Sequence, residues 1–151
     1  MRKIIYTKPD GGIAVVSPVR NTIPYVETLT DAEIEQRAFD RLPPNAINPH
    51  FVLSVPQDRT FRDAWTSNGA EVLQEINKCR EIHRAKLREM RLPKLAALDV
   101  EYMRADEDGD SAKKAEIAAK KRALRDVTNF SGIDEATTQD HLTFAIPEIL
   151  K

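Results

Sequence analysis

Cysteine is almost absent from this chain of 151 residues, with Cys79 as the single instance. One cysteine excludes an internal disulfide and suits a reducing compartment. Glycine is also scarce, and the five glycines form none of the glycine-rich motifs that cradle phosphates or expose a serine nucleophile. The sequence therefore offers no support for a nucleotide-binding loop or a serine hydrolase.

Long hydrophobic runs are missing as well. No segment approaches the roughly 18 apolar residues that a bilayer-spanning helix needs. The apolar pair Ile4-Ile5 after the basic N-terminus is too short for a signal peptide. Net charge is −1, which gives no global attraction to nucleic acid or to an anionic membrane. We therefore expect no membrane partner and no specific nucleic-acid binding.

The composition is that of a folded chain, with 41% apolar and 31% charged residues. Seven of the nine prolines precede residue 57, which marks a change in organisation along the chain. We predict an α+β fold in two parts. Residues 1–76 form a β-rich N-terminal module, and residues 77–151 form a long kinked helical hairpin with a short C-terminal helix.

The N-terminal module is predicted to contain a strand, a second strand, a helix and a third strand. The strand candidates are residues 3–7, 13–17 and 51–55. Thr30 and Glu33 form a capping box, so a helix should start there. It carries Ile34, Ala38 and Leu42 inward, and Pro43-Pro44 should stop it. This order fits a small sheet with one helix on a face.

Residues 58–76 leave two interpretations open. Asn68-Gly69 favours a hairpin turn between strands at 62–66 and 71–75, but residues 70–75 also suit a helix that runs into the next one. Phe61 and Trp65 are expected to be buried, because one face of a small sheet needs large side chains.

Two long antiparallel helices are predicted for the hairpin, at about 78–107 and 111–127, joined by Asp108-Gly109-Asp110. Asn77 is a candidate N-cap for the first helix, and Asp110 or Ser111 for the second. Pro93 lacks an amide hydrogen, so it should bend the first helix or break it. Residues at helical spacing should form the inner face of the first helix: Cys79, Ile82, Lys86 or Leu87, Met90, Leu95, Leu98, Tyr102 and Ala105.

Charge along the hairpin is segregated into three blocks. Residues 78–94 carry seven basic and two acidic side chains, residues 99–110 carry six acidic side chains and one arginine, and residues 111–127 carry six basic and two acidic ones. An antiparallel hairpin places the acidic block beside the basic second helix. Each exposed pair contributes only about 0.2–1 kcal/mol, so the pattern sets alignment more than stability.

No residue cluster predicts catalysis, a metal or a cofactor. The acidic run 106–110 alternates like a calcium loop, but Ser111 stands where that loop needs glycine and Ile117 where it needs glutamate. His50, His83 and His141 have no partner at metal-ligand spacing. His83 is expected in solvent and Cys79 in the core. We predict a protein that is not an enzyme and has no cofactor.

Three passages carry a resemblance to a known family. They are KIIYT (3–7) with PDGG (9–12) and VVSPV (15–19), DRTFRDAW (58–65), and the stretch 85–126 with LAALD (95–99) and ALRD (123–126). Together they resemble small proteins encoded in the tail regions of phages and prophages, some described as tail assembly or tail-fibre assembly chaperones. The resemblance implies a non-enzymatic protein that acts on tail proteins in the host cytoplasm, with association with the virion as the alternative.

We therefore expect the hairpin to bind a phage tail or tail-fibre protein, as an assembly chaperone or a tail-associated structural protein. The basic stretch 78–94 should be a solvated face or a protein contact, with Arg84, Arg88 and Arg91 exposed and touching the partner. The alternative is a phage-encoded inhibitor of a host defence enzyme, in which the acidic turn mimics nucleic acid.

Overall fold

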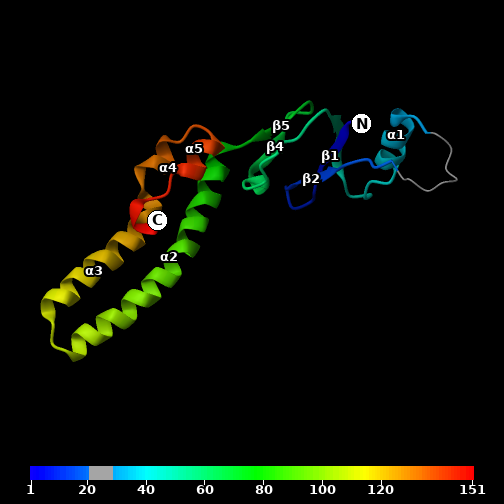
Figure 1. The fold of residues 1–151 in the computed structure, drawn as a ribbon. Helices are drawn as coiled ribbons and strands as arrows, with labels where there is room; N and C mark the ends of the chain where they lie inside the picture. Colours follow the sequence, from blue (N-terminus) through cyan, green and yellow to red (C-terminus); the bar gives the residue numbers. More distant parts are fainter. Residues whose placement is uncertain (21–28) are drawn as a thin grey trace. The chain divides into compact units, whose positions relative to one another are not determined.

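The computed structural model describes residues 1–20 and 29–151. They form two compact units, Met1–Glu75 and Ile76–Lys151. Short strands dominate the first unit and helices the second, which confirms the predicted α+β fold (Figure 1). Among the described residues, no helix combines the length and hydropathy needed to traverse a bilayer.

A three-stranded antiparallel sheet forms the centre of the first unit. Its order is β2-β1-β3, and its strands are β1 (Lys3–Thr7), β2 (Ile13–Val16) and β3 (Ile47–Val52). The first two predicted strands are confirmed, and they pair as an antiparallel hairpin. Gly11 has a φ of +85°, and the Asp10 carboxylate accepts a hydrogen bond of 2.9 Å from the amide of Gly12. This local chemistry closes the turn.

The third strand was predicted at 51–55, but it begins four residues earlier and ends three residues earlier, and its first half contains a bulge. Asn48 and Pro49 stand between the residues that pair with Thr7 and Ile5 of β1. Asn48 has a φ of +50°, a conformation that asparagine tolerates better than most residues. Since β3 is an edge strand, Pro49 removes no hydrogen bond that a neighbouring strand needs. Asparagine and proline are rare inside strands, so these two residues are the reason that the sequence did not predict the first half of β3.

The helix α1 (Asp31–Asp40) covers one face of the sheet. The capping box is confirmed, since the Thr30 hydroxyl accepts from the amide of Glu33 at 3.3 Å and the Glu33 carboxylate accepts from Thr30 at 2.8 Å. The helix ends before Leu42, because a residue that precedes proline disfavours helical geometry. Phe39 contacts the Phe51 ring of β3, with ring centroids 5.2 Å apart.

An ion pair holds α1 to the start of β1. The buried carboxylate of Glu35 accepts from the backbone amide of Arg2 and from its guanidinium at 2.9 Å. The hydrogen bond from the Arg2 amide is the main cause that lowers the pKa of Glu35 below its ordinary value. The charged carboxylate is therefore the form that joins helix to strand.

The other face of the sheet packs against a second hairpin. It comprises the short 3-10 helix η1 (Arg62–Ala64), β4 (Trp65–Ser67) and β5 (Val72–Gln74). The hairpin interpretation of this segment is confirmed, but residues 62–64 are helical rather than strand. Asn68 accepts hydrogen bonds of 2.9 Å from the amides of Ala70 and Glu71, which fixes the turn.

The hydrophobic core of the first unit lies between this hairpin and the sheet. Its buried members are Ile5, Ile13, Val52, Val55 and Trp65. Trp65 is 2% exposed and Phe61 is 1% exposed, so both expected core residues are confirmed. His50 of β3 adds a polar link to the hairpin, with Nε2 at 2.8 Å from the Ser67 hydroxyl.

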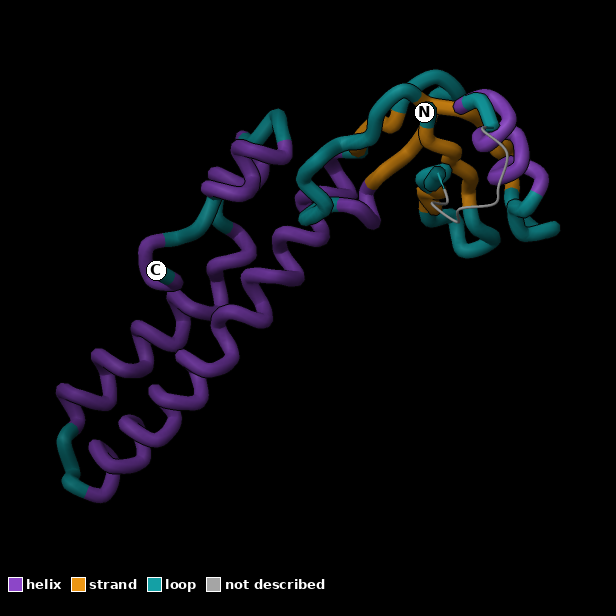
Figure 2. Tube along the Cα trace, turned by 45° about the vertical axis from the view of Figure 1, so that its right-hand side comes forward, coloured by secondary structure: helices purple, strands orange, loops and turns teal. Residues whose placement is uncertain are grey.

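The second unit is built on two long antiparallel helices, α2 (Ile76–Glu107) and α3 (Ser111–Arg125). They lie side by side in Figures 1 and 2. Gly109 has a φ of +69° in the connecting turn, and Asp110 caps α3 by accepting from the amide of Lys113 at 2.8 Å. These are the turn and one of the two caps that the sequence predicted.

One expectation for α2 is corrected, and the expectation for Pro93, a bend or a break, is narrowed. The helix begins at Ile76 rather than after Asn77. The amide of Glu75 still donates a hydrogen bond to the carbonyl of Ala64, so Glu75 is the last residue that belongs to the preceding hairpin. Asn77 instead accepts from the Arg80 guanidinium at 2.9 Å. α2 also continues without interruption through Pro93, and Figure 1 draws it as one ribbon that curves along its length. The break considered for this proline is absent.

Four short helices follow α3. They are η2 (Asp126–Asn129), α4 (Ser131–Glu135), α5 (Gln139–Phe144) and η3 (Glu148–Leu150). α5 is the short C-terminal helix that the sequence predicted, and the Thr138 hydroxyl caps it by accepting from the amide of His141 at 3.3 Å. Leu142 and Leu150 are buried, so this C-terminal segment packs onto the body of the second unit.

Candidate functional site

Four basic residues of α2 donate to main-chain carbonyls at the end of α3 and in the segment that follows it. Arg80 donates to Asp134 and Ala136 at 2.9 Å, Arg84 to Thr128 at 3.3 Å, Arg91 to Arg125 at 2.6 Å, and Lys94 to Ile149 at 3.0 Å. These carbonyls lie in or next to the last turns of helices, where backbone oxygens have no partner within the helix. Cationic side chains are well suited to that position.

His83 lies on the same side of α2 as these basic residues and also contacts a main-chain carbonyl. It is 1% exposed, and its Nε2 lies 2.9 Å from the carbonyl oxygen of Ala145. The expectation that His83 is solvated is therefore wrong. It stands four residues from both Cys79 and Leu87, which are buried as predicted, so helical geometry places all three on one stripe.

The three predicted partner-binding arginines do not share one environment. Arg88 is exposed. Arg84 has a side chain that is 27% exposed and forms an ion pair of 2.6 Å with Asp134, and Arg91 is half-buried. The expected exposure is thus wrong for Arg84 and Arg91, because carbonyls far along the chain use their donors. For Arg88 the expected exposure is confirmed, and its contact with a partner stays a prediction.

On the side facing α3, the charge blocks pair as the antiparallel alignment requires. Asp106 pairs with Lys114 and Asp99 with Lys121. Both lysine ammonium groups also lie over the Tyr102 ring, at 5.5 and 5.3 Å from its centroid. The hydrogen bond that the Lys114 ammonium donates to the Asp106 carboxylate raises the pKa of Lys114. These contacts fix the register of the two helices.

A row of apolar residues lies exposed on α2, which the sequence did not predict. We call Leu92, Ala96, Val100 and Met103 the outer stripe. The exposed fractions are 61% for Leu92, 49% for Val100 and 63% for Met103. Their spacing of four, eight and eleven residues places them on one helical face. The sequence contains this spacing, but α2 has two apolar stripes. The longer one, from Cys79 to Ala105, was predicted as the inner face.

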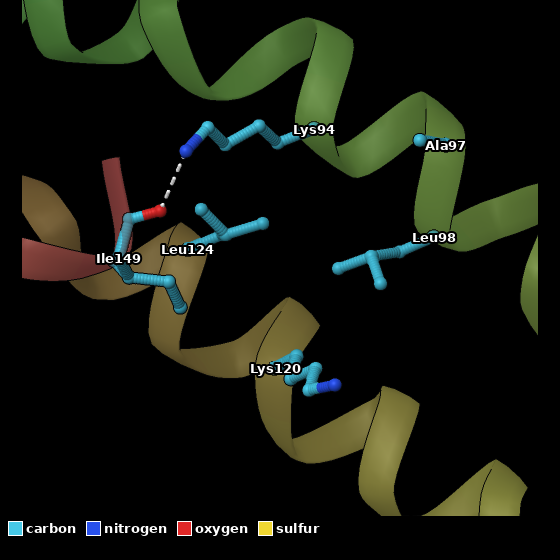
Figure 3. Close-up of a pocket in the computed structure, with 6 residues that line it drawn as sticks. All are labelled: Lys94, Ala97, Leu98, Lys120, Leu124 and Ile149. Carbon is cyan, nitrogen blue, oxygen red and sulfur yellow. Dashed lines mark hydrogen bonds between the residues drawn. The ribbon is translucent and has the colours of Figure 1, made fainter. Parts of the chain in front are cut away.

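A small pocket lies between α2 and α3 (Figure 3). We call it the hairpin pocket, and its volume is about 360 Å³. Its lining residues are Lys94, Ala97, Leu98, Lys120, Leu124 and Ile149. Figure 3 shows Leu98 of α2 and Leu124 of α3 pointing toward the same gap, with Lys94 reaching the Ile149 carbonyl.

The acidic turn of the hairpin is partly engaged in the fold. Asp106 pairs with Lys114, and Asp110 caps α3. The described residues, 1–20 and 29–151, contain no group of three or more acidic, histidine or cysteine side chains placed to hold a metal ion. Asp110 of this turn therefore stabilises the start of α3, and Asp106 helps to align α3 with α2.

The surface of the hairpin is thus the most distinctive part of the second unit, with the outer stripe on α2 and the hairpin pocket beside it. Comparisons with protein-family models, curated proteins and solved structures found no match to this chain. The family resemblance therefore stays a prediction, and the candidate site is defined by its own geometry.

Proposed function

We propose that this protein is a non-enzymatic binding protein whose helical hairpin docks onto another protein through the outer stripe. The observation that carries the proposal is the exposure of three large apolar side chains, Leu92, Val100 and Met103, on one face of a helix. Single exposed apolar residues are ordinary, but a contiguous row marks an interaction surface. Burying each such side chain contributes about 1.5–3 kcal/mol.

The form of the stripe indicates how a partner is bound. A helix that presents apolar residues every three to four positions fits an apolar groove or another helix on its partner. Arg88 lies one turn before Leu92 and is exposed, so it is placed to contact the rim of that interface. Rim charges affect the association rate more than the affinity.

The proposed partner is a phage tail or tail-fibre protein, with this chain as assembly chaperone or tail-associated structural protein in the host cytoplasm. The support is the resemblance of residues 3–19, 58–65 and 85–126 to tail-region proteins. The rival proposal, an inhibitor that mimics nucleic acid with its acidic turn, is less well supported. Asp106 and Asp110 of that turn are already engaged within the hairpin.

The test is co-expression of the tagged chain with each tail protein of the phage, followed by pull-down. We expect the wild type to retain one of them. Changing Leu92, Val100 and Met103 together to glutamine should weaken that complex about 100-fold or more, since each interface anchor lost costs more than 1 kcal/mol. Glutamine is a good helix former, so α2 should persist.

The matched control changes Leu53 and Phe144 to glutamine, because both are exposed apolar residues outside the stripe, at 85% and 81% exposure. This control should retain the tail protein like the wild type. If the wild type, the outer-stripe variant and this control all retain the tail protein equally, the interface does not lie on the outer stripe of α2. If the wild type retains no tail protein, the assembly proposal fails and the inhibitor proposal takes its place.

A further inference from the structure

We infer that Ser67 is a nucleophilic serine that His50 activates, and that it accepts an acyl group from activated esters. This inference concerns the first unit and is independent of the proposed function, which rests on α2. The Ser67 hydroxyl at the end of β4 and the imidazole of His50 in β3 meet with Oγ and Nε2 2.8 Å apart. A hydroxyl and a base within hydrogen-bond reach form the first half of the arrangement that activates serine nucleophiles.

The other ring nitrogen of His50 fixes the direction of that hydrogen bond. Nδ1 lies 2.8 Å from the main-chain carbonyl oxygen of Asn48, and a carbonyl can only accept a hydrogen bond. In the neutral imidazole Nδ1 therefore carries the hydrogen and Nε2 the lone pair. The Ser67 hydroxyl donates to that lone pair, so the base is already aimed at the proton that the nucleophile must lose.

The strand itself supplies the group that orients His50. Asn48 stands in the bulge of β3 with a φ of +50°, and its carbonyl reaches the histidine two residues later. The backbone of His50 pairs with Ile5 of the central strand, and Ile5 is buried. A base that a third group holds in place completes the arrangement, since it keeps the imidazole in one tautomer and one orientation.

The turn after β4 supports the negative charge that develops on the serine oxygen. The amide of Gly69 donates to Ser67 Oγ at 3.1 Å, and a hydrogen bond to an oxygen that loses its proton favours the charged form. Gly69 has a φ of +92°, a conformation that favours glycine. Ser67 and His50 are both half-buried, so a small ester can approach the pair from solvent.

The covalent step is an acyl transfer whose only co-reactant is the ester. Ser67 Oγ forms a bond to the carbonyl carbon of the ester while the serine proton passes to His50 Nε2. The bond from that carbon to the leaving oxygen then breaks, and the leaving group departs with the electron pair. His50 returns its proton to the leaving group or to water. The products are an ester of Ser67 and a free alcohol or phenol.

The relative reactivity of two serines tests the inference. The probe is p-nitrophenyl acetate, added briefly to the full chain, and mass spectrometry of peptides locates the acetyl groups. Ser54 is the matched control, because it belongs to the same unit and is exposed, whereas Ser67 is half-buried. Exposure alone would make Ser54 the faster of the two. We expect Ser67 to be acetylated about 100-fold faster, which is what a positioned base contributes.

Replacing the base separates activation from exposure. His50→Gln should slow the acetylation of Ser67 about 100-fold and leave that of Ser54 unchanged. In the wild type, Ser67 should be acetylated more slowly in D2O than in H2O, because a proton moves in the step. A bond that only joins β3 to the hairpin would produce no such difference. Hydrogen exchange of the β1 amides reports whether the first unit stays folded in the variant.

Three results would overturn the inference. Acetylation of Ser67 no faster than that of Ser54 in the wild type would show that the hydrogen bond is only a structural link. Equal acetylation of Ser67 in the wild type and in folded His50→Gln would show that the histidine does not act as the base. A nitrogen NMR spectrum that places the hydrogen of neutral His50 on Nε2 would contradict the tautomer, since Nε2 could not then accept from Ser67. The first and third results need no variant, so they decide even if His50→Gln does not fold.

Discussion

Replacing Trp65 with alanine is expected to lower the free energy of unfolding of the Met1–Glu75 unit by about 3–5 kcal/mol. Trp65 is 2% exposed and lies in the core cluster with Ile5 and Val52, so its removal leaves a large cavity between the sheet and the β4–β5 hairpin. The measurement is hydrogen exchange of the β1 amides, which reports the opening of this unit alone.

Trp65→Phe is the matched control. It keeps an aromatic ring in the cluster and removes Nε1, which is buried and has no hydrogen-bond partner among the described residues. We expect this change to cost less than Trp65→Ala, since the phenyl ring leaves a smaller cavity than alanine does. A loss below about 1 kcal/mol for Trp65→Ala would contradict its assignment to the core and indicate a surface residue.

The second large effect is expected from reversing two arginines of α2. Arg84→Glu combined with Arg91→Glu should lower the free energy of unfolding of the Ile76–Lys151 unit by about 3–5 kcal/mol. Each change removes a charged donor from a main-chain carbonyl, Thr128 or Arg125, and such bonds contribute about 1.5–3 kcal/mol. Urea unfolding followed by far-ultraviolet circular dichroism measures the loss, since this unit is mainly helical.

Arg88→Glu is the control within the same helix. Arg88 is exposed, so its reversal should change stability by no more than about 0.5 kcal/mol. Equal and small effects for Arg84, Arg88 and Arg91 would show that the C-terminal segment is held by its apolar contacts and not by the basic residues of α2. In a stable Arg88→Glu protein, slower association with the partner at low salt would support its place at the interface rim.

Elements with local signals were predictable from the sequence. The capping box at Thr30, the turn glycine at 109 and the cap at Asp110 each need contacts only within a few residues, and each appears as expected. The alignment of α2 with α3 was also predictable, because charge blocks of opposite sign must lie side by side in an antiparallel hairpin. Local contacts and the order of the charge blocks were therefore sufficient to predict these parts of the fold.

The inner role of the basic residues was not predictable, because their partners are distant. His83, Arg84 and Arg91 bond to carbonyls that lie 62, 44 and 34 residues further along the chain. Every residue has a main-chain carbonyl, so the residue types do not show which carbonyl will accept a hydrogen bond. Basic side chains on a helix were therefore assigned to solvent or to a partner protein, which remains the prediction for Arg88 alone.

The candidate surface was missed for a different reason. Apolar residues on α2 lie on two faces, and only one of them can be covered by α3 and the C-terminal segment. Sequence periodicity indicates that a face is apolar, but it does not indicate whether the fold covers it. The structure separates the buried stripe, with Leu87 and Ala105, from the exposed one, with Leu92 and Met103.

Methionine oxidation in the captured complex tests the central claim, that the outer stripe is the docking face, most directly. Met103 belongs to the stripe and is 63% exposed, and Met1 of the other unit is 51% exposed, so both should react readily with dilute peroxide in the free protein. We expect the partner to slow the oxidation of Met103 several-fold and to leave the oxidation of Met1 unchanged, as measured by mass spectrometry. Oxidation of Met103 at the same rate in the free and bound protein would contradict it.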